Sequence, residues 1–390
     1  MPMSVSPPRA GAPAYFDHAA TTPLRPESLS AMLPYLTEHF GNASGGHALA
    51  RRARRAIDEG RDTVAECLGC EPGEVVFTSG GTEACNLAVL GAPVSRGSVV
   101  CSAVEHHAVR NACAAVGGAE VPVDSSGTVD LDRLDELVDP DVGLVSVMLV
   151  NNEVGSIQPL ADVAGIVRER APRAILHTDA VAAVGFLDVA ALTSVADLVS
   201  VSGHKFGGPK GAGALVVRNG VQLSPVLHGG SQERGRRPGT HDVAGIVGMA
   251  VALAAATAER VQTGERVAVL RDRLADGLSA VPGVVETGVR RNRHGHPDRA
   301  GKVASSCHVC VEGVDQEELI VLLDDAGVCS SAGAACASGA LEPSHVLMAM
   351  GLSASQAKSA LRFSLGYTTT DAEVEFALAA FPKAVERLRA

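Results

Sequence analysis

Short apolar runs alternate with helix-like stretches from about residue 74 to residue 218. Several of the runs are almost wholly apolar, which is typical of strands in a sheet that helices cover on both faces. The runs that predict strands are Val75–Thr78, Ser98–Ser102, Glu120–Val123, Gly143–Val150, Ala174–Thr178, Leu198–Ser202 and Gly213–Val217. The stretches that predict helices include Cys85–Leu90, Ala108–Ala115, Leu131–Leu137 and Leu160–Arg170. This alternation predicts a doubly wound, mainly parallel α/β sheet.

The pattern changes after Gly220. A loop rich in Gly, Arg and Pro, from His228 to Thr240, precedes a long Ala-rich helix that continues towards Leu278. Beyond about Val281, short strands mix with helices such as those expected at 316–326 and 372–389. We therefore expect a large domain at 20–262 and a small α+β domain formed by 1–19 and 263–390.

Composition limits the classes of function. The 390 residues suit two joined domains, and 46% hydrophobic with 20% charged residues is ordinary for a globular protein. The net charge of −11 argues against direct nucleic-acid binding, which needs a basic face. The longest uncharged stretch, Val243–Ala258, is shorter than the ~20 residues of a membrane-spanning helix. With nine Cys and a start that lacks an apolar signal segment, we expect a cytoplasmic protein without a membrane partner.

Two CxxC pairs need an interpretation. Cys67 and Cys70 follow an amphipathic stretch, whereas Cys307 and Cys310 lie in a β-like run, 305–311. Residues three apart on a strand face opposite sides, so the second pair is poorly placed to chelate. We expect buried small hydrophobes, with a zinc site shared between the pairs as the alternative.

Candidate chemistry appears at the ends of the expected strands. Asp179 ends one strand, and Lys205 follows the next strand in a loop of small residues, 202–211. A Gly-rich turn at 78–83 leads from a strand into a helix, an arrangement that suits a phosphate group. Pyridoxal phosphate (PLP) needs a Lys that binds it covalently and an Asp that keeps its pyridine nitrogen protonated. For either residue alone, a structural ion pair at the sheet edge is the alternative.

A late cysteine adds a nucleophile to this set. Cys336 lies within a run of very small residues, Ser330–Gly339, which is poorly suited to core packing. Such a run suits a loop that carries a thiol to and from a pocket.

Together these residues resemble the group I cysteine desulfurases, the NifS/IscS-like branch of the fold-type I, class V aminotransferase-like PLP enzymes. The resemblance covers nearly the whole chain. Its motifs occur in the family's order: Tyr15–Pro23, Phe40-Gly41-Asn42, Val76–Gly80, Glu105-His106, Val150–Gly155, Ser202–Lys205, His228-Gly229-Gly230, Gln232–Gly235, Gly239-Thr240, Leu341–Leu347 and Leu361–Gly366.

The resemblance implies a fold-type I PLP-dependent transferase with a role for each matching residue. Lys205 would hold the cofactor and act as the base at Cα, Asp179 would pair with the pyridine nitrogen, and His106 would stack on the ring. Asn152 would lie near the cofactor hydroxyl and the substrate. The cofactor phosphate would be held by a set of small and polar residues: Gly81, Thr82, Ser202 and His204, with Thr240 from the partner subunit of a homodimer.

The resemblance also implies a reaction. Arg362 would bind the carboxylate of L-cysteine, and the thiolate of Cys336 would take the substrate sulfur as a persulfide, leaving L-alanine. The sulfur would pass to an acceptor protein in iron–sulfur assembly, tRNA thiolation or DNA sulfur modification.

One departure bears on the cofactor. Ala182 stands where members of this family usually have a Gln that donates to the cofactor's phenolic oxygen, so we expect a change in PLP affinity. The alternatives are a selenocysteine lyase or another β-eliminating PLP enzyme, and a sulfur-relay scaffold that binds PLP poorly.

Overall fold

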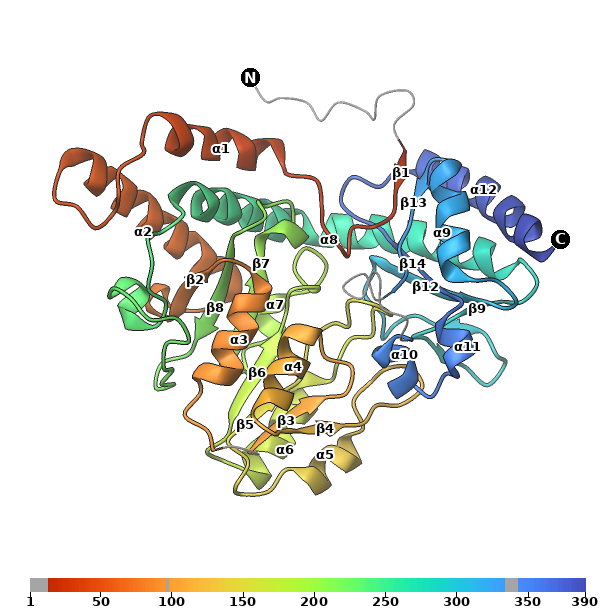
Figure 1. Cartoon of the computed structure of the whole chain (residues 1–390), viewed down its shortest axis with the longest axis horizontal. Coiled ribbons are helices and arrows are strands. Elements are labelled where there is room, and N and C mark those ends of the chain that lie inside the picture. Colours follow the sequence, from red (N-terminus) through yellow and green to blue (C-terminus); the bar gives the residue numbers. More distant parts are fainter. Residues whose placement is uncertain (1–12, 96–97, 334–342) are drawn as a thin grey trace.

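The computed structural model describes residues 13–95, 98–333 and 343–390. A seven-stranded sheet forms its centre, and strand β8 is antiparallel to both neighbours while the other pairs are parallel (Figure 1). In spatial order the strands are β2 (Val75–Thr78), β8 (Gly213–Val217), β7 (Leu198–Ser202), β6 (Ile175–Asp179), β5 (Leu144–Ser146), β3 (Val99–Ser102) and β4 (Ala119–Val121). All the strands predicted between residues 74 and 218 lie in this sheet, which confirms the mainly parallel α/β fold.

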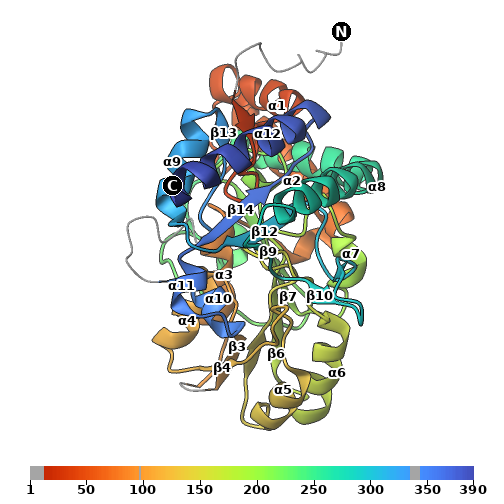
Figure 2. The same ribbon diagram turned by 90° about the vertical axis from the view of Figure 1, so that its right-hand side faces the viewer.

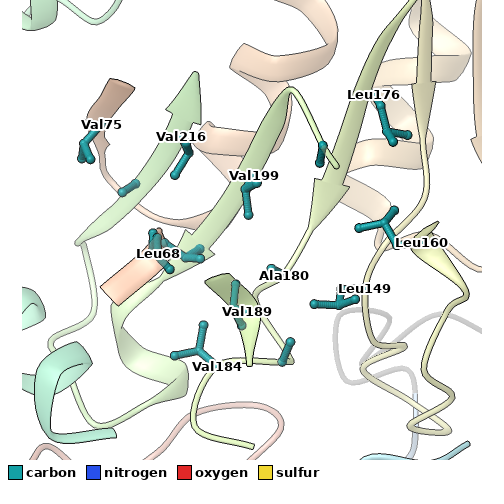
Figure 3. Packing of buried hydrophobic residues seen from close by; sticks show 14 of the residues in the cluster. Leu68, Val75, Leu149, Leu160, Leu176, Ala180, Val184, Val189, Val199 and Val216 are labelled. Atoms are coloured by element: carbon teal, nitrogen blue, oxygen red, sulfur yellow. The ribbon is translucent and has the colours of Figure 1, made fainter. Parts of the chain in front are cut away.

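Helices cover both faces of this sheet because successive strand residues point to opposite sides. On one face, Val75, Val216, Val199 and Leu176 from four neighbouring strands lie side by side (Figure 3) and belong to the core that includes helices α2, α6 and α8. On the other face, Val76 and its neighbours pack against α3 and α4. The larger helices of this part are α1 (Pro26–Thr37), α2 (Ala48–Leu68), α3 (Gly81–Gly91), α4 (His107–Ala115), α5 (Leu131–Leu137) and α6 (Leu160–Arg170).

A second, smaller sheet lies beside the first (Figure 2). It is antiparallel, with the order β14 (Ala360–Ser364), β12 (Ser306–Val311) and β9 (Val284–Glu286). Helices α9 (Gln316–Asp325) and α12 (Asp371–Arg389) contribute to its core, together with the C-terminal half of α8. The chain's N-terminal strand β1 (Ala14–Tyr15) pairs with β13 (Val328–Cys329) here.

The remaining elements are short. They are helices α7 (Val189–Leu192), α10 (His345–Ala349) and α11 (Ala354–Ala357), the hairpin strands β10 (Arg290–Arg291) and β11 (Pro297–Asp298), and the 3₁₀ turns η1 (Pro72–Glu74), η2 (Gly203–Lys205) and η3 (Gln232–Gly235).

Helix α8 (Val243–Ser279) runs from one sheet to the other. It packs against α1 and α2 near the large sheet and against α12 and β12 near the small one. It continues without interruption past the expected domain boundary at 262/263, and the boundary itself stays a prediction. Within the described residues, α8 is the one helix long and apolar enough to cross a membrane, and half of its most apolar window is buried, as in a core helix.

The two CxxC pairs have different surroundings. Cys307 and Cys310 both lie on β12, but Cys307 belongs to the small sheet's core and Cys310 to an apolar cluster on the opposite side. Their opposite orientation confirms the expectation from strand geometry. Cys67 and Cys70 are half-buried against the large core. In the part of the chain that the structure describes, no group of three or more His, Cys, Asp or Glu side chains is arranged to hold a metal ion.

Candidate functional site

A cavity of about 380 Å³ lies at the carboxyl ends of β6 and β7, where open α/β sheets place their ligands. Its far wall comes from the small sheet, through Arg362 on β14. Among the residues that the structure describes, the cavity brings together all the predicted site residues except Thr240. Those that line it are Gly81, Thr82, His106, Asn152, Asp179, Ser202, His204, Lys205 and Arg362.

Lys205 and Asp179 lie at neighbouring strand ends. Asp179 is 5% exposed, its Oδ1 accepts a hydrogen bond from Val181 N at 2.9 Å, and the thiol of Cys85 lies 3.6 Å from Oδ2. Lys205 Nζ donates to the backbone oxygens of Ala19 and, at 3.0 Å, Ala20. The carboxylate is thus fixed in direction, and the amine is held at the cavity wall by acceptors that carry no charge.

The turn between β2 and α3 has the shape that a phosphate requires. Gly80 has φ 150°, and a side chain at Gly213 would lie 2.6 Å from the Gly80 Cα atom, so both positions need glycine. A side chain on Gly81 would lie 2.9 Å from Val181. Gly80 provides no side-chain cap to the start of α3 within the described part of the chain, and Ser202 lines the cavity beside it, so this helix start fits a phosphate dianion.

His204 completes this end of the cavity as a neutral group. Burial, together with the charges of Lys205 and Lys210, lowers the pKa of His204 to about 4. Its Nδ1 lies 3.2 Å from the Thr21 hydroxyl. A neutral imidazole here offers a hydrogen bond without adding charge beside the lysine.

His106 caps helix α4 and lines the opposite side of the cavity. Its Nδ1 accepts a hydrogen bond from Ala108 N at 3.1 Å. In the neutral ring, the proton therefore resides on Nε2. This contact sets the orientation of the ring, as a stacking and proton-transfer role would require.

A buried polar chain lies behind the cavity. His177 bridges two strands, with Nδ1 2.8 Å from Ser146 Oγ and Nε2 2.9 Å from Ser200 Oγ. Burial lowers the pKa of His177 to about 3. Ser146 Oγ also donates to Glu105 at 3.3 Å, and burial followed by the charge of Asp179 raises the pKa of Glu105 well above 4.5. Glu105 and Asp179 are thus two carboxyl groups that face the same buried polar chain, and the raised pKa of Glu105 reflects both its burial and this neighbour.

Arg362 is 2% exposed and reaches across from the small sheet. Its guanidinium donates to Asn152 O at 2.9 Å and to Gly333 O at 3.1 Å, and to the Asp17 carboxylate at 3.0 Å. The guanidinium is therefore oriented to donate hydrogen bonds to a carboxylate, as it does to that of Asp17. The residue also holds the chain immediately before the segment that contains Cys336.

Several lining residues carry no role in the sequence-based prediction. Glu105, Glu153 and His345 line the cavity, and Asp17 pairs with Arg362. Each of them lies within one of the family motifs, but the resemblance assigned it no individual role. The available signal was a carboxylate placed directly beside an expected site residue, as at 105/106 and 152/153.

Residues 14–376 match the model of the aminotransferase class-V family. The chain belongs to this family. A cysteine desulfurase IscS of Methanosarcina thermophila is 41% identical over 384 residues, covering 96% of this chain and 92% of the relative.

Solved structures with this fold match nearly the whole chain. A NifS-like protein superposes with a TM-score of 0.86 at 34% identity, covering 97% of this chain and 99% of that one. A structure described as SspA in complex with cysteine gives 0.76 at 30% identity, covering 91% and 99%. The match spans both sheets and the cavity between them.

Two predicted site residues are not among the described residues that line the cavity. Cys336 lies outside the described residues, so its assignment stays a prediction. Thr240 is exposed and is not among the described residues that line the cavity of its own chain. Its place in a neighbouring subunit's site also stays a prediction.

The loop that presents Thr240 is held by a buried ion pair. Glu233 and Arg234 have φ of 47° and 57°, a strained conformation for residues with side chains. The Glu233 carboxylate accepts hydrogen bonds from the two terminal nitrogens of Arg61, at 2.8 and 2.6 Å, and its Oε1 lies 2.7 Å from His241 Nε2. The strain is thus offset by contacts of one carboxylate. Nearby in the same loop, Arg237 pairs with Glu83 of the same chain at 2.7 Å.

Replacing Arg61 with Met should lower the free energy of unfolding by about 3–5 kcal/mol, because a buried carboxylate loses its main partner. Burial alone would raise the pKa of Glu233, but hydrogen bonds from His241 and Arg61 lower it from 4.5 to about 2. A depressed pKa stabilises the fold above the unfolded value, so this contribution should disappear as the pH falls from about 4.5 towards 2. Urea titration at pH 7 and pH 3 measures both effects. Arg52→Met, at an exposed position, serves as the control and should change little.

Ala182 lines the cavity that holds the predicted site residues. It also lines a smaller cavity of about 60 Å³ that Lys205 borders too. That space is large enough for water and for part of a longer side chain. We expect Ala182→Gln to tighten PLP binding about 2- to 10-fold, since one added hydrogen bond contributes about 0.5–1.5 kcal/mol. Fluorescence titration of the apoprotein with PLP measures the dissociation constant. Equal or weaker binding would show that this chain orients the cofactor by other groups.

Proposed function

We propose that this protein is a PLP-dependent cysteine desulfurase. L-Cysteine and the Cys336 thiol become L-alanine and a Cys336 persulfide: the substrate C–S bond breaks, an S–S bond forms, and the thiol proton balances the new C–H bond. The observation that carries this proposal is that Lys205, Asp179 and Arg362 line one cavity. The name of the similar M. thermophila protein and the cysteine bound in the SspA structure support the substrate.

Each residue has a defined task. When bound, PLP supplies an electron sink that weakens the C–S bond of cysteine. The Arg362 guanidinium binds the substrate carboxylate and thereby orients Cα, while Lys205 Nζ moves the proton at Cα. The start of α3 and Ser202 would hold the cofactor phosphate, and Asp179 would hold the pyridine nitrogen. His106, with Nδ1 fixed by Ala108 N, presents Nε2 for proton transfer.

A visible spectrum followed by addition of L-cysteine tests the proposal. The purified protein with PLP should absorb near about 400 nm, where PLP bound to lysine absorbs, and cysteine should change that band and yield alanine. A band without alanine would contradict the desulfurase. No band after reconstitution would favour the scaffold, and faster alanine formation from selenocysteine than from cysteine would favour a selenocysteine lyase.

We also propose a cytoplasmic homodimer that passes sulfur to an acceptor protein. The exposed position of Thr240, away from its own cavity, supports a site shared between subunits. Exposed apolar side chains gather on α1 and the residues after it: Leu29, Leu33, Leu36 and Phe40. Light scattering on the purified protein distinguishes a dimer from a monomer. The acceptor, in iron–sulfur assembly, tRNA thiolation or DNA sulfur modification, is identified by capture with persulfidated enzyme.

A further inference from the structure

Glu153 is a carboxylic acid buried beside the cavity with no part in the reaction described above. It is 2% exposed and follows Asn152 directly in the loop after β5. Asn151 shapes this loop, because its side-chain oxygen accepts hydrogen bonds from Glu153 N and Val154 N, both at 2.9 Å. The loop thus fixes where the carboxyl group of Glu153 points.

The two carboxyl oxygens contact both sides of the Cys336 segment. Ser344 Oγ donates to Glu153 Oε2 at 2.8 Å. On the other side, a Cβ atom at Gly333 would lie only 2.5 Å from Glu153 Oε1, so the backbone there packs directly on the carboxyl group. Residues 333 and 344 flank the segment 334–342, which contains Cys336.

The surroundings of Glu153 are polar but incompletely paired. His308 Nε2 on β12 lies 3.8 Å from Oε1, and neither atom has a hydrogen-bond partner within the described part of the chain. Burial raises the pKa of Glu153 to about 7, although the hydrogen bond from Ser344 and the charge of Arg362 lower it. The titratable groups that face it are Arg362, His308 and Cys310.

A carboxyl group in such a place is costly unless its contacts offset its desolvation. An apolar side chain of similar volume would fill the same space without that cost. What the carboxyl group provides is a connection between three segments: the cavity loop, the chain at Gly333 and the chain at Ser344. Arg362 joins the same set, since it donates to both Asn152 O and Gly333 O.

We propose that Glu153 is a positioning residue for sulfur transfer, which holds the residues on either side of the Cys336-bearing segment against the cavity loop. The inference rests on the proposed role of Cys336. In this proposal Glu153 affects the second half of the reaction, in which the sulfur reaches the Cys336 thiol. Cysteine binding, the first half, depends on Lys205 and Arg362.

The test separates these two halves in the PLP-loaded enzyme. In Glu153→Leu, the change in the visible spectrum on adding cysteine should stay within about twofold of wild type, while the rate of persulfide formation on Cys336 falls about 10-fold or more, as expected for a lost buried hydrogen bond. Mass spectrometry of the Cys336 peptide measures the persulfide. Glu153→Gln, whose amide oxygen still accepts from Ser344, should recover most of the rate.

A second readout needs no turnover. Alkylation of Cys336 in the apoprotein, followed on the same peptide, should change in rate in Glu153→Leu and in Ser344→Ala, because both lose the anchor at residue 344. If Glu153→Leu fails to fold, Ser344→Ala carries the test with a smaller loss of the same kind. Glu74→Gln alters another buried carboxyl group, one outside the cavity. It should leave both the spectral change and the rate of persulfide formation as in wild type.

The outcomes distinguish this inference from the proposed function. Sulfur release that persists in Cys336→Ala would overturn the role of Cys336 and the inference with it. If release is lost in Cys336→Ala but persulfide formation and alkylation in Glu153→Leu match wild type, the inference alone is wrong. A parallel fall of the spectral change and persulfide formation in Glu153→Leu would also overturn it, since that pattern indicates a general structural role.

Discussion

Cys336→Ala is expected to retain bound PLP and its visible band but to lose sulfur transfer from cysteine by about 10³-fold or more, the scale on which removal of an essential nucleophile acts. The cavity residues that would hold the cofactor come from other parts of the chain, so cofactor binding should not depend on this thiol. Sulfide released in the presence of a reductant and alanine formed from cysteine are the two quantities to measure.

A matched variant removes a different thiol close in sequence. Cys329→Ala alters a half-buried thiol on β13, which pairs with β1, and should retain sulfur transfer within about twofold. Comparable loss in both variants would point to structural damage. Full activity in Cys336→Ala would mean that another thiol carries the sulfur.

Lys205→Ala is expected to lower alanine formation by about 10²–10⁴-fold, the range that one acid–base group contributes. Loss of the covalent attachment to PLP adds to this effect. Borohydride reduction of the loaded wild-type enzyme should fix the cofactor on the peptide that contains Lys205, as peptide mass analysis would show. The same treatment of Lys205→Ala should leave that peptide unmodified.

Lys210→Ala is the control for Lys205→Ala. Lys210 is exposed and lies five residues further along the same loop. Cofactor attachment and alanine formation should survive its replacement. Attachment of PLP at Lys210, or at any peptide other than that of Lys205, would contradict the assignment of the internal lysine.

The sequence was sufficient for the large sheet because its strands are buried on both faces. Near-continuous apolar runs such as Gly213–Val217 have few other stable arrangements in a chain that alternates them with helices. The predicted run Gly143–Val150 was longer than β5, but Val147 N and Leu149 N still bond to His177 O and Asp179 O, so this chain continues alongside β6. The strand ends then brought the predicted polar residues to one edge of the sheet.

Contacts between segments far apart in the sequence could not be predicted in the same way. Asp17 and Arg362 are 345 residues apart in sequence and meet at 3.0 Å, and Glu153 and Ser344 are 191 residues apart. No periodic pattern encodes such a pairing, because it depends on how distant segments pack in the folded chain. The family resemblance supplied Arg362, but not the partners that hold it.

The predicted boundary at 262/263 falls where α8 is exposed between the two cores. Val261 is exposed there, while Met249 and Leu274 on either side are buried in different cores. A helix needs no break to pass between two cores, so the boundary inside α8 stays a prediction.

Helix α8 therefore fixes the distance and the angle between the two cores that carry the walls of the cavity. Its 37 residues correspond to a rod of about 55 Å at the usual rise per residue. Inserting a single residue midway would turn everything beyond it by about 100° and shift it by about 1.5 Å. The alignment of Arg362 with Lys205 is thus tied to the length of this one helix, which gives the middle of α8 a lower tolerance for insertions and deletions than its exposed side chains suggest.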